Sequence, residues 1–479
     1  MTHLFDAVIV GAGPNGLTAA ARLAVAGRSV LVIEAGPTIG GGSRTKPLLD
    51  SGAVYDVCAA VHPFGVSSPA FAELRLHEHG LQWLHPEIGL AHPFDDGTAA
   101  ALYRSVSSSP TTADGLGVDA AQWRRLVGFM ASDWDRWRKF AMAGVVTNLV
   151  HHPIDMVRFG ALAGMPATVA ARLFHSREAR ALITGMAAHS GASLRQPATS
   201  GVAFSLAAAS ESAGMPFAAG GSQSIVDALA SVITRAGGLI ETGRLITSLR
   251  DLPSSRAVLL DVTPGQAAGI VGVPSATWKH GVAATWKHGV AACKIDMVLS
   301  GPMPWTAPQC RAAGTVHLGG EWRDIAAAEG RTAKGELPDN PYVIVTQPSL
   351  VDASRAPTGQ YVVWAYRHVP NGCTSTEAAK GIERQLDRFA PGWRDLVLHK
   401  RVTNALDYEA YNPGYIGGDI AGGAMTLKQM IARPRLALDP YRTRHDGVWL
   451  CSQSTAPGPG VHGMCGWHAA ASVLKHQPD

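Results

Sequence analysis

The stretch DAVIVGAGPNGLTAAARLAVAGRSVLVIEAG, residues 6–36, has the pattern of a strand, a glycine turn, a helix and a second strand. Residues 8–10 are a continuous apolar run, which is typical of a parallel strand buried on both faces. Gly11, Gly13 and Gly16 complete a G-x-G-x-x-G motif. In such a turn the first glycine permits the bend, the second lets the backbone approach a pyrophosphate, and the third lets helix and strand pack closely. The stretch therefore predicts a dinucleotide-binding βαβ unit.

An acidic residue ends the second strand of this unit. Glu34 lies 18 residues after Gly16, where a carboxylate accepts hydrogen bonds from both ribose hydroxyls and repels a 2′-phosphate. This position argues against NADP. The first turn of the helix, which contains Pro14 and Asn15, is expected to direct its amides at the phosphates. The βαβ unit alone does not separate FAD from NAD.

The residues that follow the second strand favour FAD. The sequence EAGPTIGGGSRT, residues 34–45, places Gly40 and Gly41 shortly after the acidic residue and Thr45 just beyond them. This resembles the E-x5-G-G extension of the glutathione-reductase-type FAD domains, in which the chain passes close to the dinucleotide. By that resemblance, Ala35, Gly40, Gly41 and Thr45 border the cofactor.

The composition indicates a well-packed globular chain without a nucleic-acid partner. A length of 479 residues favours two domains, and the 46% hydrophobic and 16% charged content gives no sign of disorder. The 41 basic and 37 acidic residues give a formal charge of +4, with no basic run. Six cysteines without a C-x-x-C pair, and no secretory signal, favour a cytoplasmic protein. We expect no membrane-spanning helix, because charged residues and prolines interrupt the apolar stretches.

Motifs spread over nearly the whole chain resemble one family. They are VIVGAGPNGLTAAARLA, IGGGSRT, GGSQSIVDALA, DVTP, NPGYIGGDIAGGAMTLKQM and WLCSQSTAPGPGVHGMCGWHAA. The first is shared by many flavoproteins. The last two are specific to the phytoene-desaturase-like (phytoene dehydrogenase-related) branch of the FAD-dependent amine oxidase superfamily, which the chain resembles. The resemblance implies an α/β fold with a Rossmann-like FAD-binding domain of the glutathione-reductase type and an inserted α+β substrate domain.

The expected domains are discontinuous. The FAD-binding domain comprises residues 1–75, 205–270 and 425–479, and the substrate domain comprises residues 76–204 and 271–424, with residues 118–200 mainly helical. In relatives that act on long polyenes, the helical region forms an apolar tunnel with a membrane-facing mouth. Residues 140–174 could give lipid access at a bilayer surface in the same way. A plain helical core is the alternative that we favour.

The resemblance also assigns cofactor contacts outside the first βαβ unit. The region of Ile246 supplies backbone contacts to the adenine, and the loop 417–425 lies near the isoalloxazine ring. That loop has no cysteine where the covalently flavinylated relatives carry theirs, so FAD is expected to be non-covalent. Many relatives have glycine and an acidic residue where this chain has Ser452 and Gln453, whose side chains can still hydrogen-bond to the ribityl chain.

The stretch WLCSQSTAPGPGVHGMCGWHAAASVLK, residues 449–475, crowds glycines, histidines and cysteines at the start of the last helix. One interpretation is a metal site of His462, Cys465 and His468. Because a helix turns about 100° per residue, His468 lies nearly opposite the face that the other two share, so we expect no metal. We expect instead that the glycines let the backbone approach the flavin, and that the helix N-terminus stabilises the negative charge of reduced flavin. The expected contacts are Ser452, Gly460, Val461 and Gly463.

A lysine in the apolar strand CKIDMVL is the candidate catalytic residue. Lys294 is followed by a Gly-Pro turn and Trp305, and in amine oxidases this arrangement places the lysine beside flavin N5 through a water. The alternative, of equal weight, is a salt bridge with Asp296, two residues on and on the same strand face. The phrase ATWKHGVA occurs twice just before, at 276–283 and 284–291, and is interpreted as a local duplication in a connecting segment.

The predicted function is FAD-dependent removal of hydride from an apolar or moderately polar substrate. The favoured reaction is desaturation or isomerisation of an isoprenoid-like chain, and amine oxidation to C=N is the second candidate. Electrons would pass to oxygen, a quinone or another acceptor. We expect a small, hydrophobic substrate and no nucleic-acid partner, with peripheral membrane contact left open.

Two alternatives of other classes were weighed. The GDP-dissociation inhibitors share the architecture, carry prenylated GTPases and bind no FAD. The intact glycine motif, Glu34 and the C-terminal glycines argue against that class. An NAD-dependent dehydrogenase does not account for the return of the C-terminus to the first domain.

Overall fold

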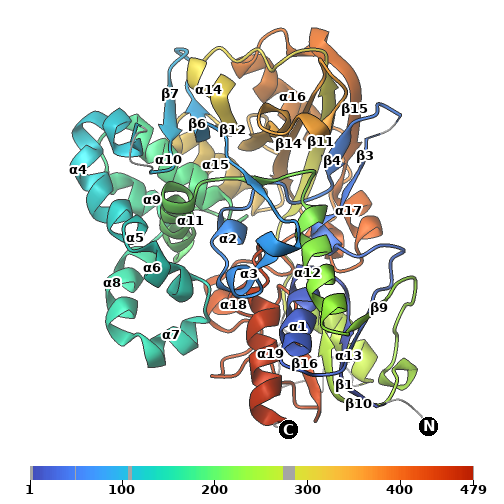
Figure 1. The fold of residues 1–479 in the computed structure, drawn as a ribbon. Helices are drawn as coiled ribbons and strands as arrows, with labels where there is room; N and C mark the ends of the chain where they lie inside the picture. The colour runs from blue at the N-terminus through green and yellow to red at the C-terminus, as the bar shows by residue number, and fades with distance from the viewer. Residues whose placement is uncertain (1–3, 49, 106–109, 273–285, 478–479) are drawn as a thin grey trace.

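The computed structural model describes residues 4–48, 50–105, 110–272 and 286–477. Two large sheets and a group of helices organise the chain (Figure 1). A parallel sheet with its helices occupies the lower part of the view, a mixed sheet lies at the upper right, and the helical part lies at the left. This is the predicted α/β fold, with a Rossmann-like part and an α+β part.

The parallel sheet has five strands in the order β16–β10–β1–β2–β9. They are β1 (Phe5–Val10), β2 (Val30–Ile33), β9 (Leu239–Glu241), β10 (Ser255–Leu260) and β16 (Val448–Leu450). β1 is central, and its Val8 aligns with Leu31 on one side and Val258 on the other. Helices α1 (Pro14–Val25), α12 (Gln223–Arg235) and α19 (Met464–His476) cover one face, and α13 (Pro264–Val271) covers the other. The strands come from the N-terminal, middle and C-terminal thirds of the chain, while the domain boundaries stay a prediction.

Helices α1 and α19 pack closely because small residues line their contact. α1 has the alanine-rich sequence PNGLTAAARLAV. A Cβ at Gly466 would lie 1.8 Å from the carbonyl oxygen of Asn15, and a Cβ at Gly463 would lie 2.2 Å from Oγ1 of Thr18. Neither position of α19 or its cap admits a side chain. The C-terminal helix therefore braces the first turn of α1.

The mixed sheet has seven strands in the order β15–β11–β14–β13–β12–β6–β7. They are β6 (Ile88–Pro93), β7 (Ala99–Leu102), β11 (Ala291–Leu299), β12 (Ala313–Leu318), β13 (Val343–Thr346), β14 (Tyr361–Val369) and β15 (Val397–Thr403). β12 pairs with β6 in parallel, and the other pairs are antiparallel. One face is apolar and is covered by α14 (Pro308–Ala312) and α16 (Glu377–Phe389).

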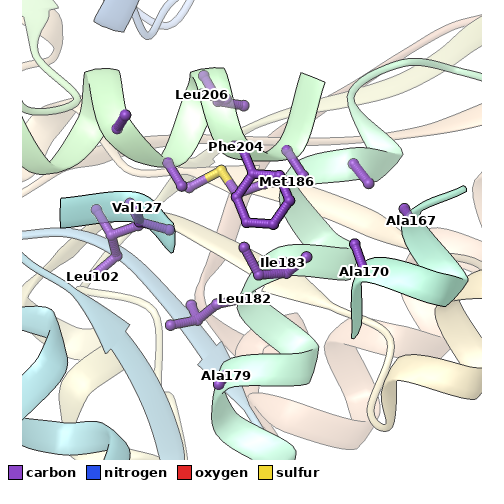
Figure 2. Packing of buried hydrophobic residues seen from close by; sticks show 14 of the residues in the cluster. Leu102, Val127, Ala167, Ala170, Ala179, Leu182, Ile183, Met186, Phe204 and Leu206 are labelled. Atoms are coloured by element: carbon purple, nitrogen blue, oxygen red, sulfur yellow. The ribbon is translucent and has the colours of Figure 1, made fainter. Parts of the chain in front are cut away.

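The part between residues 118 and 200 is mainly helical. It contains α4 (Ala120–Trp123), a π-helix (Arg124–Gly128), α5 (Phe129–Ala131), α6 (Trp134–Ala141), α7 (Val145–His151), α8 (Pro153–Ala163), α9 (Ala167–Ala170) and α10 (Arg177–Ala188), and α11 (Thr199–Ala213) completes the bundle. Its core is apolar and aromatic. Figure 2 shows Phe204 of α11 beside Met186 and Ile183 of α10.

Helices α7 and α8 expose apolar side chains. The exposed residues are Val145, Leu149, Val150, Ile154 and Val157. In the described ranges, no helix is long and apolar enough to cross a membrane. Membrane contact by residues 140–174 stays a prediction. The duplicated phrase lies outside the described residues up to position 285.

Shorter elements connect these parts. They are β3 (Thr45–Pro47), β4 (Val54–Asp56), α2 (Pro63–Val66), α3 (Pro69–Glu73), β5 (Trp83–Leu84), β8 (Phe217–Ala218), α15 (Trp322–Thr332), α17 (Ala405–Tyr411) and α18 (Leu427–Ile431). β3 pairs with β4, and β5 pairs with β8.

We predict that Gly466→Ala destabilises the protein by about 2–3 kcal/mol, because the added methyl meets rigid backbone and forces α19 away from α1. Urea unfolding measures the loss. Gly160→Ala in α8 is the matched control, since a Cβ there would meet nothing within 4 Å. The control should be neutral or stabilise by up to about 1 kcal/mol. Equal stability of the two variants would contradict the packing argument.

Candidate functional site

The carboxyl ends of the parallel strands bring distant residues to one edge of the sheet. Gly11 follows β1, Glu34 follows β2, Asp261 follows β10, and Ser452 comes two residues after β16. Ligands of open α/β sheets bind at this edge. Gly11, Glu34 and Ser452 were predicted as site residues, and Asp261 was not.

The turn after β1 has no room for side chains. Gly11 has a φ of +101°, and a Cβ there would lie 2.8 Å from the carbonyl oxygen of Asp261. A Cβ at Gly16 would lie 2.2 Å from the carbonyl oxygen of Gly11, and one at Gly13 would lie 2.7 Å from Oδ2 of Asp261. The turn therefore keeps its backbone bare at the start of α1, which is what a phosphate at a helix N-terminus requires.

Two backbone amides and a guanidinium hold Glu34. Its Oε2 accepts a hydrogen bond from the amide of Ala12 at 2.8 Å, and its Oε1 accepts one from the amide of Gly36 at 2.8 Å. Arg44 Nη2 lies 3.2 Å from Oε1. Sequence reasoning missed Arg44, although it directly follows the glycine extension in GGGSRT. The edge thus offers a carboxylate that can accept from hydroxyls and, beside it, a cation.

The glycine extension packs on the turn, and its predicted contact with a dinucleotide stays a prediction. The amide of Gly40 donates to the carbonyl oxygen of Ala12 at 2.9 Å. A Cβ at Gly41 would lie 3.1 Å from Cα of Gly13. The two predicted glycines therefore lie against the dinucleotide-type turn and complete its wall.

Two buried polar atoms next to the turn have no hydrogen-bond partner among the described residues. They are Oδ1 of Asn15, in the first turn of α1, and Oγ of Ser43, in the short helical turn Gly41–Ser43. Leaving such an atom unpaired costs about 1–3 kcal/mol, so a ligand rich in polar groups fits here. Together with Glu34 and Arg44, this edge suits a dinucleotide with phosphates and a ribose.

Asp261 places a carboxyl group at the phosphate end of the turn. Its Oδ2 accepts a hydrogen bond from the amide of Gly16 at 2.9 Å. Desolvation raises its pKa to about 7, and the nearby charge of Glu34 adds to the rise. The motif DVTP, which begins with Asp261, marked this residue, but the contact with Gly16, 245 positions away, was not predicted from it. The protonation state of Asp261 therefore changes near neutral pH at the place where a pyrophosphate would lie.

Three residues predicted to border the cofactor have other neighbours. Thr45 Oγ1 donates to Oδ1 of Asp56 at 2.7 Å and accepts from the amide of Gln223 at 3.1 Å. Ile246 is buried in the apolar core on the α13 side of the sheet. Ala35 is exposed. Their contacts to a cofactor stay predictions.

The glycines of the C-terminal stretch lie against protein atoms. A Cβ at Gly460 would lie 2.9 Å from Cδ2 of His462, and Gly463 touches α1 as described above. Val461 is partly buried in the core beneath α1 and α19. Ser452 is buried, and its Oγ accepts from the amide of Ser454 at 3.3 Å. Protein packing alone thus requires glycine at 463, where crowding by the cofactor had been the expected reason, and contacts of this stretch to a cofactor stay predictions.

The histidines and cysteine of this stretch face separate partners. His462 Nδ1 accepts from the amide of Met464 at 3.0 Å. Cys465 Sγ lies 3.4 Å from the carbonyl oxygen of Gly458, and His468 Nε2 lies 3.0 Å from that of Met142. Over the described part of the chain, no group of three or more His, Cys, Asp or Glu could hold a metal ion.

Lys294 is buried in β11 and directs its ammonium group at protein acceptors. Nζ donates to the carbonyl oxygens of Asp56 at 2.6 Å and Val57 at 3.2 Å. It also lies 2.7 Å from Oδ1 of Asp296, so the salt bridge weighed against a catalytic role is present. Burial raises the pKa of Asp296 to about 6, although Lys294 opposes the rise. A catalytic role for Lys294 stays a prediction.

A second buried ion pair joins β4 to the mixed-sheet part. Arg355 Nη2 lies 2.9 Å from Oδ2 of Asp56, and Arg355 Nε lies 3.0 Å from Oδ2 of Asp352. The amide of Gly220 donates to the same oxygen of Asp352 at 2.9 Å. Sequence reasoning missed this group, since no motif links its members.

The loop 417–425 is tied to the C-terminal segment. Gln453 Nε2 donates to the carbonyl oxygen of Ile420 at 3.0 Å. The buried Arg433 donates to the carbonyl oxygens of Ala421 at 2.9 Å and Gln453 at 3.0 Å. Gln453 therefore holds this loop in place.

Comparison with known proteins agrees with this geometry. Residues 9–89 match the NAD(P)-binding Rossmann-like domain family. The chain is 25% identical to pyridine nucleotide-disulfide oxidoreductase domain-containing protein 2 of Rattus norvegicus, over 98% of this chain and 93% of the relative. It is 26% identical to phytoene dehydrogenase of Streptomyces griseus, over 91% of this chain and 85% of the relative.

Solved structures show the same fold. Cyclohexylamine oxidase from Brevibacterium oxydans superposes with a TM-score of 0.61 and 16% identity, covering 99% of both chains. The chain is thus similar in sequence, at low identity, to proteins that include a phytoene dehydrogenase, and it shares the fold of a flavin amine oxidase.

Proposed function

We propose that the chain is an oxidoreductase that binds FAD non-covalently at the carboxyl edge of its parallel sheet. The observation that carries the proposal is the bare glycine turn flanked by Glu34 and the Gly40–Gly41 wall. The missing cysteine in the loop 417–425 supports a non-covalent cofactor. FAD bound there would supply a hydride acceptor.

Each residue of the edge has a distinct task in this proposal. The N-terminal end of α1 receives the pyrophosphate, which the bare glycines let approach, while the amide of Gly16 keeps its hydrogen bond to Asp261. Glu34 accepts from the ribose hydroxyls, and Arg44 orients that carboxylate. Asn15 and Ser43 supply polar atoms that the protein itself leaves unpaired in the described residues.

We propose an isoprenoid-like chain as the substrate: desaturation would transfer a hydride from it to the cofactor and release a proton, whereas in isomerisation the hydride would be returned to the chain. The similarity to phytoene dehydrogenase of Streptomyces griseus supports this choice. Oxygen, a quinone or another compound would take up the electrons.

The absorption spectrum of the purified protein tests the cofactor. Flavin bands should survive desalting, bleach on anaerobic reduction and return when an acceptor is added. Fast return in air indicates an oxidase, and slow return indicates another acceptor. A protein that stays colourless and refuses added FAD would reject the proposal and favour a carrier of the GDP-dissociation-inhibitor type.

We predict that FAD affinity depends on pH through Asp261. An ionised carboxylate repels a pyrophosphate and a protonated one does not, so the affinity should fall as pH rises through the pKa of about 7. The fall is up to about tenfold per pH unit above that pKa, because binding takes up one proton. In Asp261→Asn the affinity should stay flat with pH and exceed that of the wild type at high pH. Fluorescence titration with FAD measures both.

The control for this prediction is Asp446→Asn, which removes the same charge from a side chain that is 98% exposed. The FAD affinity of this variant should change with pH as that of the wild type does.

Thermal unfolding of the ligand-free proteins gives a second measurement. The pKa of Asp261 is raised from 3.8 to about 7 by folding, so stability falls as pH rises from about 4 to about 7 and stays low above that range; Asp261→Asn should therefore gain on the wild type through this range and melt higher at pH 7 and above. A wild-type affinity that does not change with pH would contradict the role of Asp261.

We predict that Lys294→Met destabilises the protein by about 3–5 kcal/mol, because it leaves the buried Asp296 without its counter-ion. Lys294→Met/Asp296→Asn should recover more than half of that loss in urea unfolding. The stable double variant then separates the two roles of the lysine. Flavin reoxidation slower than in the wild type would support a catalytic Lys294, whereas an unchanged rate would leave only the structural role.

A further inference from the structure

The mixed sheet has one apolar and one polar face. Alternate residues of its central strands, such as Ile295, Val316, Val345 and Val363, pack in the apolar core under α14 and α16. The residues between them point the other way, because side chains alternate along a strand. Several of these are polar and buried, which is unusual for a protein interior.

Four of the polar residues form one row across adjacent strands. Thr315 of β12 pairs with Thr346 of β13, Thr346 pairs with Trp364 of β14, and Trp364 pairs with Asp296 of β11. Directly paired side chains on one face lie about 4.5–5.5 Å apart at Cβ, so the four form a continuous line. They are between 0% and 4% exposed.

Every member of the row has a polar atom without a partner in the described part of the protein. These atoms are Oγ1 of Thr315, Oγ1 of Thr346, Nε1 of Trp364 and Oδ2 of Asp296. Buried polar groups in native proteins are nearly always hydrogen-bonded, and exceptions call for a ligand or water. Four such atoms in register on four neighbouring strands indicate a binding surface.

The row lies where two parts of the molecule meet. Ile344, next to Thr346 in β13, packs in the core of the helical part. Trp364 packs against Ala60, in the segment that follows β4, and against Phe217. That segment leads to the dinucleotide edge, since the amide of Ala59 donates to the carbonyl oxygen of Gly42 at 3.2 Å. A ligand on the row would thus touch both the helical part and the segment bordering the proposed cofactor site.

The charges around the row balance. Lys294 pairs with Asp296, and Arg355 pairs with Asp56 and Asp352. Arg401 lies opposite Asp296 in the register of β11 and β15, and its positive charge opposes the rise in the pKa of Asp296. Among the described residues, Lys294 and Arg355 are thus already engaged by carboxylates and are not free to bind a charged ligand.

We propose that this row binds a hydroxyl group of the substrate, so that the isoprenoid-like chain is an alcohol and not a bare hydrocarbon or an amine. This rests on the proposed function, because it places the group in the substrate site of that oxidoreductase. A hydroxyl can accept from the indole N–H of Trp364 and donate to Oδ2 of Asp296 or to a threonine. An ammonium group can only donate, and a hydrocarbon can do neither.

Three probes with one carbon skeleton test the proposal. They are geraniol, the matching hydrocarbon without the hydroxyl, and geranylamine, each titrated into the protein with and without FAD while tryptophan fluorescence is followed. Geraniol should bind at least about tenfold more tightly than the hydrocarbon and the amine, as two hydrogen bonds allow. The double variant Thr315→Val/Thr346→Val should reduce that preference to about threefold or less.

A matched control variant and a stability measurement test whether misfolding explains a lost preference for geraniol. Thr332→Val in α15 removes an equally buried hydroxyl that already bonds to the carbonyl oxygen of Ala328, so the preference for geraniol should persist. The ligand-free double variant should melt no lower than the wild type, because its lost hydroxyls had no partner in the described structure.

Three results would overturn the inference. Equal binding of geraniol and the hydrocarbon to the wild type would mean that the row holds water only. Tightest binding of geranylamine would indicate a cation site. A double variant that keeps the preference would place the hydroxyl elsewhere. A colourless protein that still prefers geraniol would reject the proposed flavin chemistry but not the row, whereas a yellow protein without the preference would reject the row alone.

Discussion

The backbone of Ala12 joins the three segments on which the nucleotide edge depends. Its amide donates to Glu34 at 2.8 Å, and its carbonyl oxygen accepts from the amide of Gly40 at 2.9 Å. One residue of the turn thus fixes the end of β2 and the start of the glycine extension. Because Ala12 is fully buried, any larger side chain would separate these segments.

Buried charged side chains connect the mixed sheet to the end of β4. Lys294 joins β11 to the carbonyl groups at the end of β4, and Arg355 binds the carboxylate of Asp56 there. Such pairs add little net stability, but removing one partner is costly because it leaves a bare charge in the interior. They therefore act as positioning contacts. They hold the segment after β4 between the polar row and the glycine extension.

The sequence allowed the local parts of the site to be predicted, and not the parts that depend on distant pairing. Gly11, Gly16 and Glu34 fall within one βαβ unit, so their spacing predicted their geometry. Asp261 reaches Gly16 from 245 residues away, and its strand neighbours were not known from spacing. The salt bridge of Lys294 with Asp296 could be foreseen as an alternative because two residues along a strand share a face.

The polar row shows why register matters more than composition. No sequence pattern singles out Thr315, Thr346 or Trp364. They form a row only because three strand pairings align them. The opposite face of the same strands is filled with valine, isoleucine and methionine, so an apolar lining was available to this sheet. The polar face instead keeps unpaired polar atoms, which lowers the stability of the protein. Features that lower stability in this way are concentrated at functional sites. The contrast between the two faces is therefore the strongest physical reason to place ligand recognition on the row.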